Sequence, residues 1–90
     1  MAILEKDIES ACCKLAKAAG WLSYKFVSVN NRGVPDRLFI KDGATVYVEF
    51  KAPNKLPTAL QLKVHEEMRA HGAEVHVVDD IQEFQRIFKC

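Results

Sequence analysis

Apolar residues in the first part of the chain recur at three- and four-residue spacing, which is typical of one face of an amphipathic helix. The pattern covers residues 5–19 and stops at Gly20, a residue type that commonly ends helices. Over residues 21–29, aromatic and β-branched residues roughly alternate with polar ones, which predicts a strand. The chain is therefore expected to begin with a helix followed by a strand.

Two short strands are predicted at residues 37–40 and 45–50, on either side of the dipeptide Asp42-Gly43. An Asp-Gly pair between strands favours a two-residue type I′ turn, because both central positions need a positive φ. Side chains alternate along a strand, so this turn fixes which residues face each other. The sequence therefore predicts a β-hairpin of defined register.

Three further elements, a helix, a strand and a helix, are predicted at residues 58–71, 73–78 and 81–88. The first of these helices has Leu60, Val64 and Met68 on one face, and Asp79 or Asp80 caps the last one. The order α-β-β-β-α-β-α predicts an α/β fold with a mixed central sheet flanked by helices. We expect one domain over residues 1–90.

The hairpin register has a chemical consequence. The expected cross-strand pairs are Lys41–Ala44, Ile40–Thr45, Leu38–Tyr47 and, further from the turn, Asp36–Glu49. Directly opposed side chains lie on the same face of the sheet, with Cβ atoms roughly 4.5–5.5 Å apart. Lys51 shares that face with Glu49, whereas Val48 and Phe50 point to the other side. The sequence thus predicts two facing carboxylates with an ammonium group beside them.

Two like charges in direct opposition destabilise a sheet, and a divalent cation between them would reverse that effect. Mg²⁺ favours carboxylate oxygens and commonly binds through one or two of them together with substrate phosphates. The alternative is that these are ordinary alternating charges on a solvated strand face. A one-residue slip of the register would also send the two acids to opposite faces.

Composition narrows the function classes. Hydrophobic residues make up 49% and charged residues 28% of the chain, as in ordinary globular proteins, and the net charge of +1 gives no global basic field. A nucleic acid partner would therefore need a local basic patch. Cys12, Cys13 and Cys90 do not resemble a disulfide framework, which favours a reducing, cytoplasmic setting. No membrane segment or signal peptide is expected.

The motifs "GVPD" at residues 33–36 and "EFK" at residues 49–51 resemble the PD-(D/E)XK nuclease superfamily. The longer run "RGVPD…VEFKAP" is more specific, and it resembles the VRR-NUC branch of that superfamily. The similarity covers nearly the whole chain. It implies a restriction-endonuclease-like αβββαβ core and a nuclease that depends on Mg²⁺ or Mn²⁺.

The resemblance also implies roles for individual residues. Asp36 and Glu49 would be metal ligands, and Lys51 would be the catalytic lysine. The backbone carbonyl of Phe50 would be a further ligand, together with an acidic residue of the first helix. In that helix, Glu5 is the first choice and Glu9 is the second choice. Gln61 matches the glutamine that is often found on the helix after the catalytic strand.

Isolated viral and bacterial members of the branch resemble homodimeric, structure-selective endonucleases for branched DNA such as four-way Holliday junctions. We therefore expect DNA, a second copy of the chain and no membrane as the partners. One alternative is a catalytically silent nuclease fold that binds branched DNA. The other is a restriction-type nuclease with sequence specificity.

Other residues have competing interpretations. Gln61 also fits a capping box with Thr58, and the two roles are compatible. The three histidines are interpreted as surface or core-edge residues, namely His65, His71 and His76. A local phosphate-binding surface is expected from basic and amide side chains around the site, at Arg32, Arg37, Lys55, Lys14, Lys17, Asn30 and Asn31.

Overall fold

The structure is a computed structural model that describes residues 2–90. Its elements are α1 (Glu5–Ala18), β1 (Leu22–Lys25), β2 (Arg37–Lys41), β3 (Ala44–Phe50), α2 (Ala59–Ala70), β4 (Glu74–Val78) and α3 (Ile81–Phe88). The predicted element order is confirmed. None of the helices within the described residues is long and apolar enough to cross a membrane.

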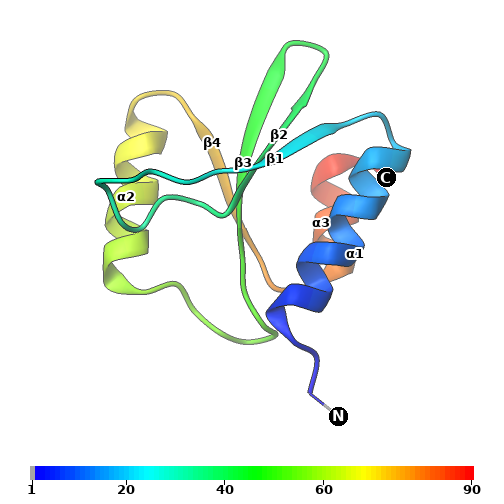
Figure 1. Cartoon of the computed structure of the whole chain (residues 1–90), viewed down its shortest axis with the longest axis horizontal. Helices are drawn as coiled ribbons and strands as arrows, with labels where there is room; N and C mark the ends of the chain where they lie inside the picture. The colour runs from blue at the N-terminus through cyan, green and yellow to red at the C-terminus, as the bar shows by residue number, and fades with distance from the viewer. Residues whose placement is uncertain (1) are drawn as a thin grey trace.

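The four strands form one sheet in the order β1-β2-β3-β4. The first three strands are antiparallel neighbours, and β4 runs parallel to β3. A parallel pair needs a crossover connection, and here α2 supplies it. Helices α1 and α3 pack together on one face of the sheet, while α2 lies on the opposite side (Figure 1). The fold is therefore the predicted mixed sheet flanked by helices.

The turn between β2 and β3 has the expected geometry. Asp42 has a φ of 51° and Gly43 a φ of 82°, so both central residues are left-handed, as a type I′ turn requires. The predicted pairs that fall within the ladder are all present: Leu38–Tyr47, Ile40–Thr45 and Lys41–Ala44. The ladder ends at Arg37–Val48, one step before Asp36 and Glu49.

The hydrophobic core lies between the sheet and the α1–α3 layer. Its fully buried members include Phe39, Val48 and Phe50 from the strands, with Cys12 and Phe84 from the two helices. Burying side chains of this size stabilises the fold by about 1.5–3 kcal/mol each. Because Val48 and Phe50 both point into this core, strand alternation directs Glu49 to the α2 side of the sheet.

The first strand is much shorter than predicted. It was expected over residues 21–29, but β1 covers only Leu22–Lys25, and its last bond runs from the Phe26 amide to the Asp36 carbonyl at 2.9 Å. The following loop lies against α2 instead of continuing the ladder. Gly33 shows the closeness of this contact, since a Cβ atom there would lie 3.0 Å from Val64 Cγ2. The loop thus leaves the sheet and returns to it at Asp36.

The inward face of α2 also differs from the prediction. Leu60 was expected to point inward, yet 47% of it is exposed. Val64 and Met68 are half-buried, and the deepest residue of the helix is His65, which is completely buried. The helix is therefore rotated so that a polar residue, and not Leu60, faces the sheet.

Candidate active site

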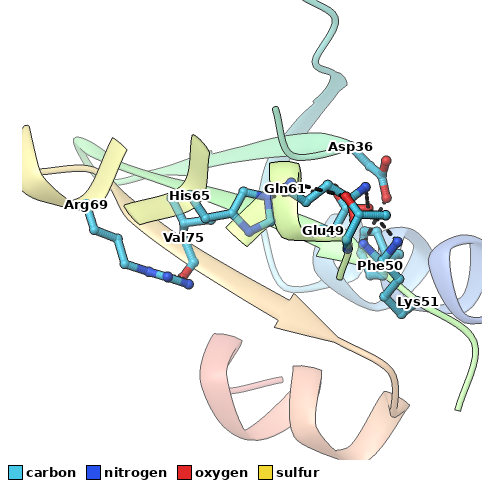
Figure 2. A network of polar contacts seen from close by, with 9 residues as sticks. Asp36, Glu49, Phe50, Lys51, Gln61, His65, Arg69 and Val75 are labelled. Carbon is cyan, nitrogen blue, oxygen red and sulfur yellow. Dashed lines mark hydrogen bonds and ion pairs between the residues drawn. The ribbon is translucent and has the colours of Figure 1, made fainter. Parts of the chain in front are cut away.

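Glu49 is the centre of the polar cluster between β3 and α2. It is only 2% exposed, which is unusual for a carboxylic acid. Gln61 donates a hydrogen bond from Nε2 to Glu49 Oε2 at 3.2 Å, and Lys51 Nζ lies 3.6 Å from the same oxygen. Figure 2 shows Glu49 surrounded by side chains from β3 and α2, with Asp36 at its outer end. Gln61 of α2 and Lys51, which directly follows β3, fix the orientation of this carboxyl group.

Asp36 is held beside Glu49 by the backbone of β3. Its Oδ2 accepts a hydrogen bond from the Phe50 amide at 2.9 Å, so the side chain spans the end of the hairpin (Figure 2). Pro35, the residue before it, is fully buried and anchors this end of the loop. The two carboxyl groups that the register brings toward each other are therefore neighbours in the folded chain.

This arrangement is electrostatically unfavourable for Glu49. The pKa of Glu49 is raised to about 7, mainly by burial and next by the charge on Asp36, whereas Lys51 opposes both effects. In addition, Glu49 Oε1 is buried and has no hydrogen-bond partner among the described residues. A buried acceptor oxygen beside a second carboxylate is a donor set that suits a hard divalent cation.

The two acidic candidates on α1 lie in different surroundings. Glu9 Oε2 is 2.6 Å from the Arg37 Nε atom, so its charge is already compensated. Arg37 is paired with Val48 across the two strands, so its side chain lies on the same face as Val48. The Arg37–Glu9 ion pair is therefore on the α1 side of the sheet. The charge on exposed Glu5, in contrast, contributes to the raised pKa of Glu49. Of the two, the structure brings Glu5 and not Glu9 toward the site.

His65 is the site residue that sequence reasoning missed. It was interpreted as a surface or core-edge residue, but it is 0% exposed and its Nε2 lies 3.9 Å from Glu49 Oε1. Neither ring nitrogen has a hydrogen-bond partner among the described residues, and burial lowers the pKa of His65, which favours the neutral ring. The available signal was the four-residue spacing from Gln61, which puts both side chains on one helix face.

Gln61 forms the capping box and contacts Glu49 at the same time. Gln61 Oε1 accepts a hydrogen bond from the Thr58 backbone amide at 2.9 Å. The Gln61 backbone amide donates to Thr58 Oγ1 at 3.1 Å, which completes the capping box. Its Nε2 atom remains free to donate to Glu49. The start of α2 and the orientation of Glu49 therefore depend on the same side chain.

The predicted basic residues do not form one surface. Arg32 lies with Asn30 and Asn31 in a hollow of about 430 Å³ between the loop and α2. Lys55 is exposed in the loop after β3. Arg37, Lys14 and Lys17 line a separate hollow beside α1. The structure thus divides the expected phosphate-binding surface among different places.

Within residues 2–90, no group of three or more His, Cys, Asp or Glu side chains is close enough to cage a metal ion. Asp36 and Glu49 therefore form a pair of neighbouring carboxyl groups, and no third such side chain of the described residues completes a cage around them. Such a pair matches the way Mg²⁺ is commonly bound, through one or two carboxylates with water and substrate phosphates.

Comparisons with known proteins support a nuclease family. No family model matches the sequence. The chain is 42% identical over 78 residues to "Putative nuclease p44" of Acyrthosiphon pisum secondary endosymbiont phage 1, which covers 86% of this chain and 84% of that protein. It is also similar to a solved structure described as "VRR_NUC domain", with a TM-score of 0.86 and 29% identity over 94% of both chains.

Proposed function

Because this chain belongs to the VRR_NUC family of nucleases, we propose that it is an endonuclease that hydrolyses phosphodiester bonds in branched DNA with the help of a divalent cation. The observation that carries the proposal is the convergence of Asp36, Glu49 and Lys51 at the end of the hairpin. Each of the three residues belongs to a motif of the nuclease type. Burial of the Glu49 carboxylate without a compensating cation would cost free energy of folding.

Asp36 and Glu49 would hold Mg²⁺ or Mn²⁺, with the Phe50 carbonyl and Glu5, directly or through water, as further ligands. When bound, the ion would polarise the scissile phosphate and lower the pKa of the attacking water. The unpaired Glu49 Oε1 supports this role, because a buried acceptor without a donor gains most from a cation.

Lys51 would act on the phosphate and on the nucleophile. Its ammonium group lies 3.6 Å from Glu49 Oε2 and is mostly shielded from solvent, with 14% of its side chain exposed. In such surroundings a fixed positive charge stabilises developing negative charge far better than in water. Lys51 would therefore orient the water and stabilise the charge that grows on the phosphate during attack.

The remaining residues of the cluster keep these groups in place. Gln61 holds one oxygen of Glu49, and the buried face of α2 closes the cluster on its inner side. A two-fold dimer, also part of this proposal, would carry two such sites, which suits paired cuts in a symmetric branched substrate.

The test is Lys51→Ala against a panel of linear, flap and four-way DNA, with Mg²⁺ and with EDTA. We expect wild type to cut branched substrates only with the cation, and the variant to bind DNA but lose at least a hundredfold in rate. Cleavage by Lys51→Ala at the wild-type rate would refute the mechanism. Binding without cleavage by wild type would instead indicate a silent DNA-binding module.

A further inference from the structure

A hollow of about 420 Å³ runs along α1, on the side away from Glu49 and His65. Its charged lining consists of Lys6, Lys14, Lys17, Lys25, Arg37 and Glu9, and we refer to it as the basic groove. The four lysines are exposed, and Arg37 is half-buried at the strand side of the groove. This groove is separate from the hollow that contains Arg32.

The groove concentrates positive charge on a chain that is nearly neutral. It holds five of the 13 lysine and arginine residues but only one of the 12 acids, although the net charge of the chain is +1. The remainder of the chain therefore has more acidic than basic residues. The single acid, Glu9, is paired with Arg37, and none of the four lysines makes an ion pair with an acid of residues 2–90.

The spacing of these charges fits a phosphate backbone. Lys6, Lys14 and Lys17 line the same hollow along α1, and the eleven-residue separation from Lys6 to Lys17 corresponds to about 16 Å of helix. Successive phosphates of one strand of B-DNA advance by about 3.4 Å along the axis, so this row would span about five of them. Lys25 and Arg37 face the row from the sheet side.

The groove and the candidate site are linked through neighbouring residues of the chain. Lys6 follows Glu5, and Arg37 follows Asp36, although successive residues at the start of β2 point to opposite faces of the sheet. From Lys6 the lysines continue along α1 toward its C-terminal end at Ala18. A duplex that passes from the site around the start of β2 to α1 would meet this row of positive charges.

We propose that the basic groove binds the phosphate backbone of one duplex arm of the DNA substrate and so orients the arm relative to the cleavage site. This inference rests on the proposed nuclease function for its choice of ligand. It adds a binding surface that includes Lys6 and Lys25 and excludes Arg32 and Lys55.

The experiment compares two double substitutions that remove the same charge. Lys14→Gln with Lys17→Gln changes the groove, and Arg86→Gln with Lys89→Gln changes the exposed end of α3. Binding of labelled four-way DNA is measured in EDTA at several salt concentrations, so that no cleavage is needed. Thermal unfolding is recorded for each variant.

The groove variant should bind about tenfold more weakly at low salt, and its slope of log affinity against log salt should fall by about two, one for each lost phosphate contact. The control variant should keep the wild-type slope. Lys6→Gln with Lys25→Gln provides a second groove variant and should repeat the effect. Equal slopes in the groove and control variants would overturn the inference, whether or not wild type cleaves DNA with Mg²⁺.

Discussion

Glu49 illustrates at the residue scale how a fold can keep a group in an unfavourable state. Its carboxyl is buried and lies beside Asp36, and its pKa is raised to about 7 from an ordinary value of 4.5. A group whose pKa is raised in the folded state stabilises the fold while it is protonated in both states. For Glu49 that contribution is complete below about pH 4.5 and is lost as the pH rises through about 7.

The first prediction therefore concerns stability in EDTA. Between pH 5.5 and 8, we expect the free energy of unfolding of wild type to decrease relative to that of Glu49→Gln, by on the order of 2 kcal/mol. Urea denaturation of both proteins at each pH measures the difference. If the two proteins show parallel pH dependences, Glu49 is ionised in the folded chain at pH 5.5 and its burial has been compensated in another way.

Addition of millimolar Mg²⁺ should change that pH dependence, because a cation binds the ionised carboxylate and competes with the proton. We expect the increase in melting temperature caused by Mg²⁺ to be larger at pH 8 than at pH 6. Glu49→Gln should show little increase at either pH. An equal increase in wild type and Glu49→Gln would mean that the ion binds elsewhere on the chain.

His65 gives a third residue-scale prediction. It is completely buried, so His65→Ala should leave a cavity under α2 and cost about 2–4 kcal/mol of stability. The neighbouring exposed residue Glu66 provides the matched control, since Glu66→Ala should change stability by less than about 0.5 kcal/mol. Urea unfolding measures both values. A similar small effect for the two variants would contradict the buried position of His65.

At the scale of elements, α2 joins helix stability to the chemistry of the site through Gln61. Thr58→Ala removes the cap alone and should cost about 1 kcal/mol, with cleavage by the folded protein preserved. Gln61→Glu keeps a capping-box residue but directs a carboxylate at Glu49. The added negative charge beside Asp36 and Glu49 attracts a divalent cation, so we expect it to strengthen Mg²⁺ binding while retaining the helix.

Circular dichroism measures the helix in both variants, and thermal unfolding with increasing Mg²⁺ measures the ion. If Thr58→Ala and Gln61→Glu changed Mg²⁺ binding equally, the effect of Gln61 would pass through the helix end and not through its contact with Glu49. The comparison thus separates the two functions of one side chain.

The elements also show why sequence reasoning succeeded at the hairpin and failed beside it. The Asp42-Gly43 turn and the alternation on both strands specify one register locally, and the structure has that register. Val27 and Val29 continue the alternation of a strand, yet they find no partner strand and remain exposed. Local propensity favours a strand there, but the tertiary contact of the loop with α2 keeps these residues out of the sheet.

The candidate site shows the same limit. Asp36, Glu49 and Lys51 could be placed together because the hairpin is a short-range structure. The burial of His65 depends on how α2 is rotated against the sheet, which is set by contacts between residues far apart in sequence. The division of the basic residues between two hollows also arises only from packing of α1 and the loop against different faces.

For the whole molecule, exposed apolar residues around α2 offer a candidate surface for the proposed dimer. Val27 is 76% and Val29 is 94% exposed, in the loop that lies against α2, and Leu60, where the loop meets that helix, is 47% exposed. Exposed apolar residues that gather around one element are typical of interaction surfaces. A surface that pairs with its own copy about a two-fold axis would bury them without extending into a filament.

We therefore expect a solution mass of about twice the 10.2 kDa of one chain. Val27→Glu with Val29→Glu should shift the protein toward the single-chain mass, because it places four like charges across a two-fold contact. Leu22→Glu, at an exposed residue of β1, is the matched control and should leave the mass unchanged. Multi-angle light scattering measures all three. A single-chain mass for wild type would refute the dimer, and dissociation by Leu22→Glu alone would move the interface to the free edge of the sheet.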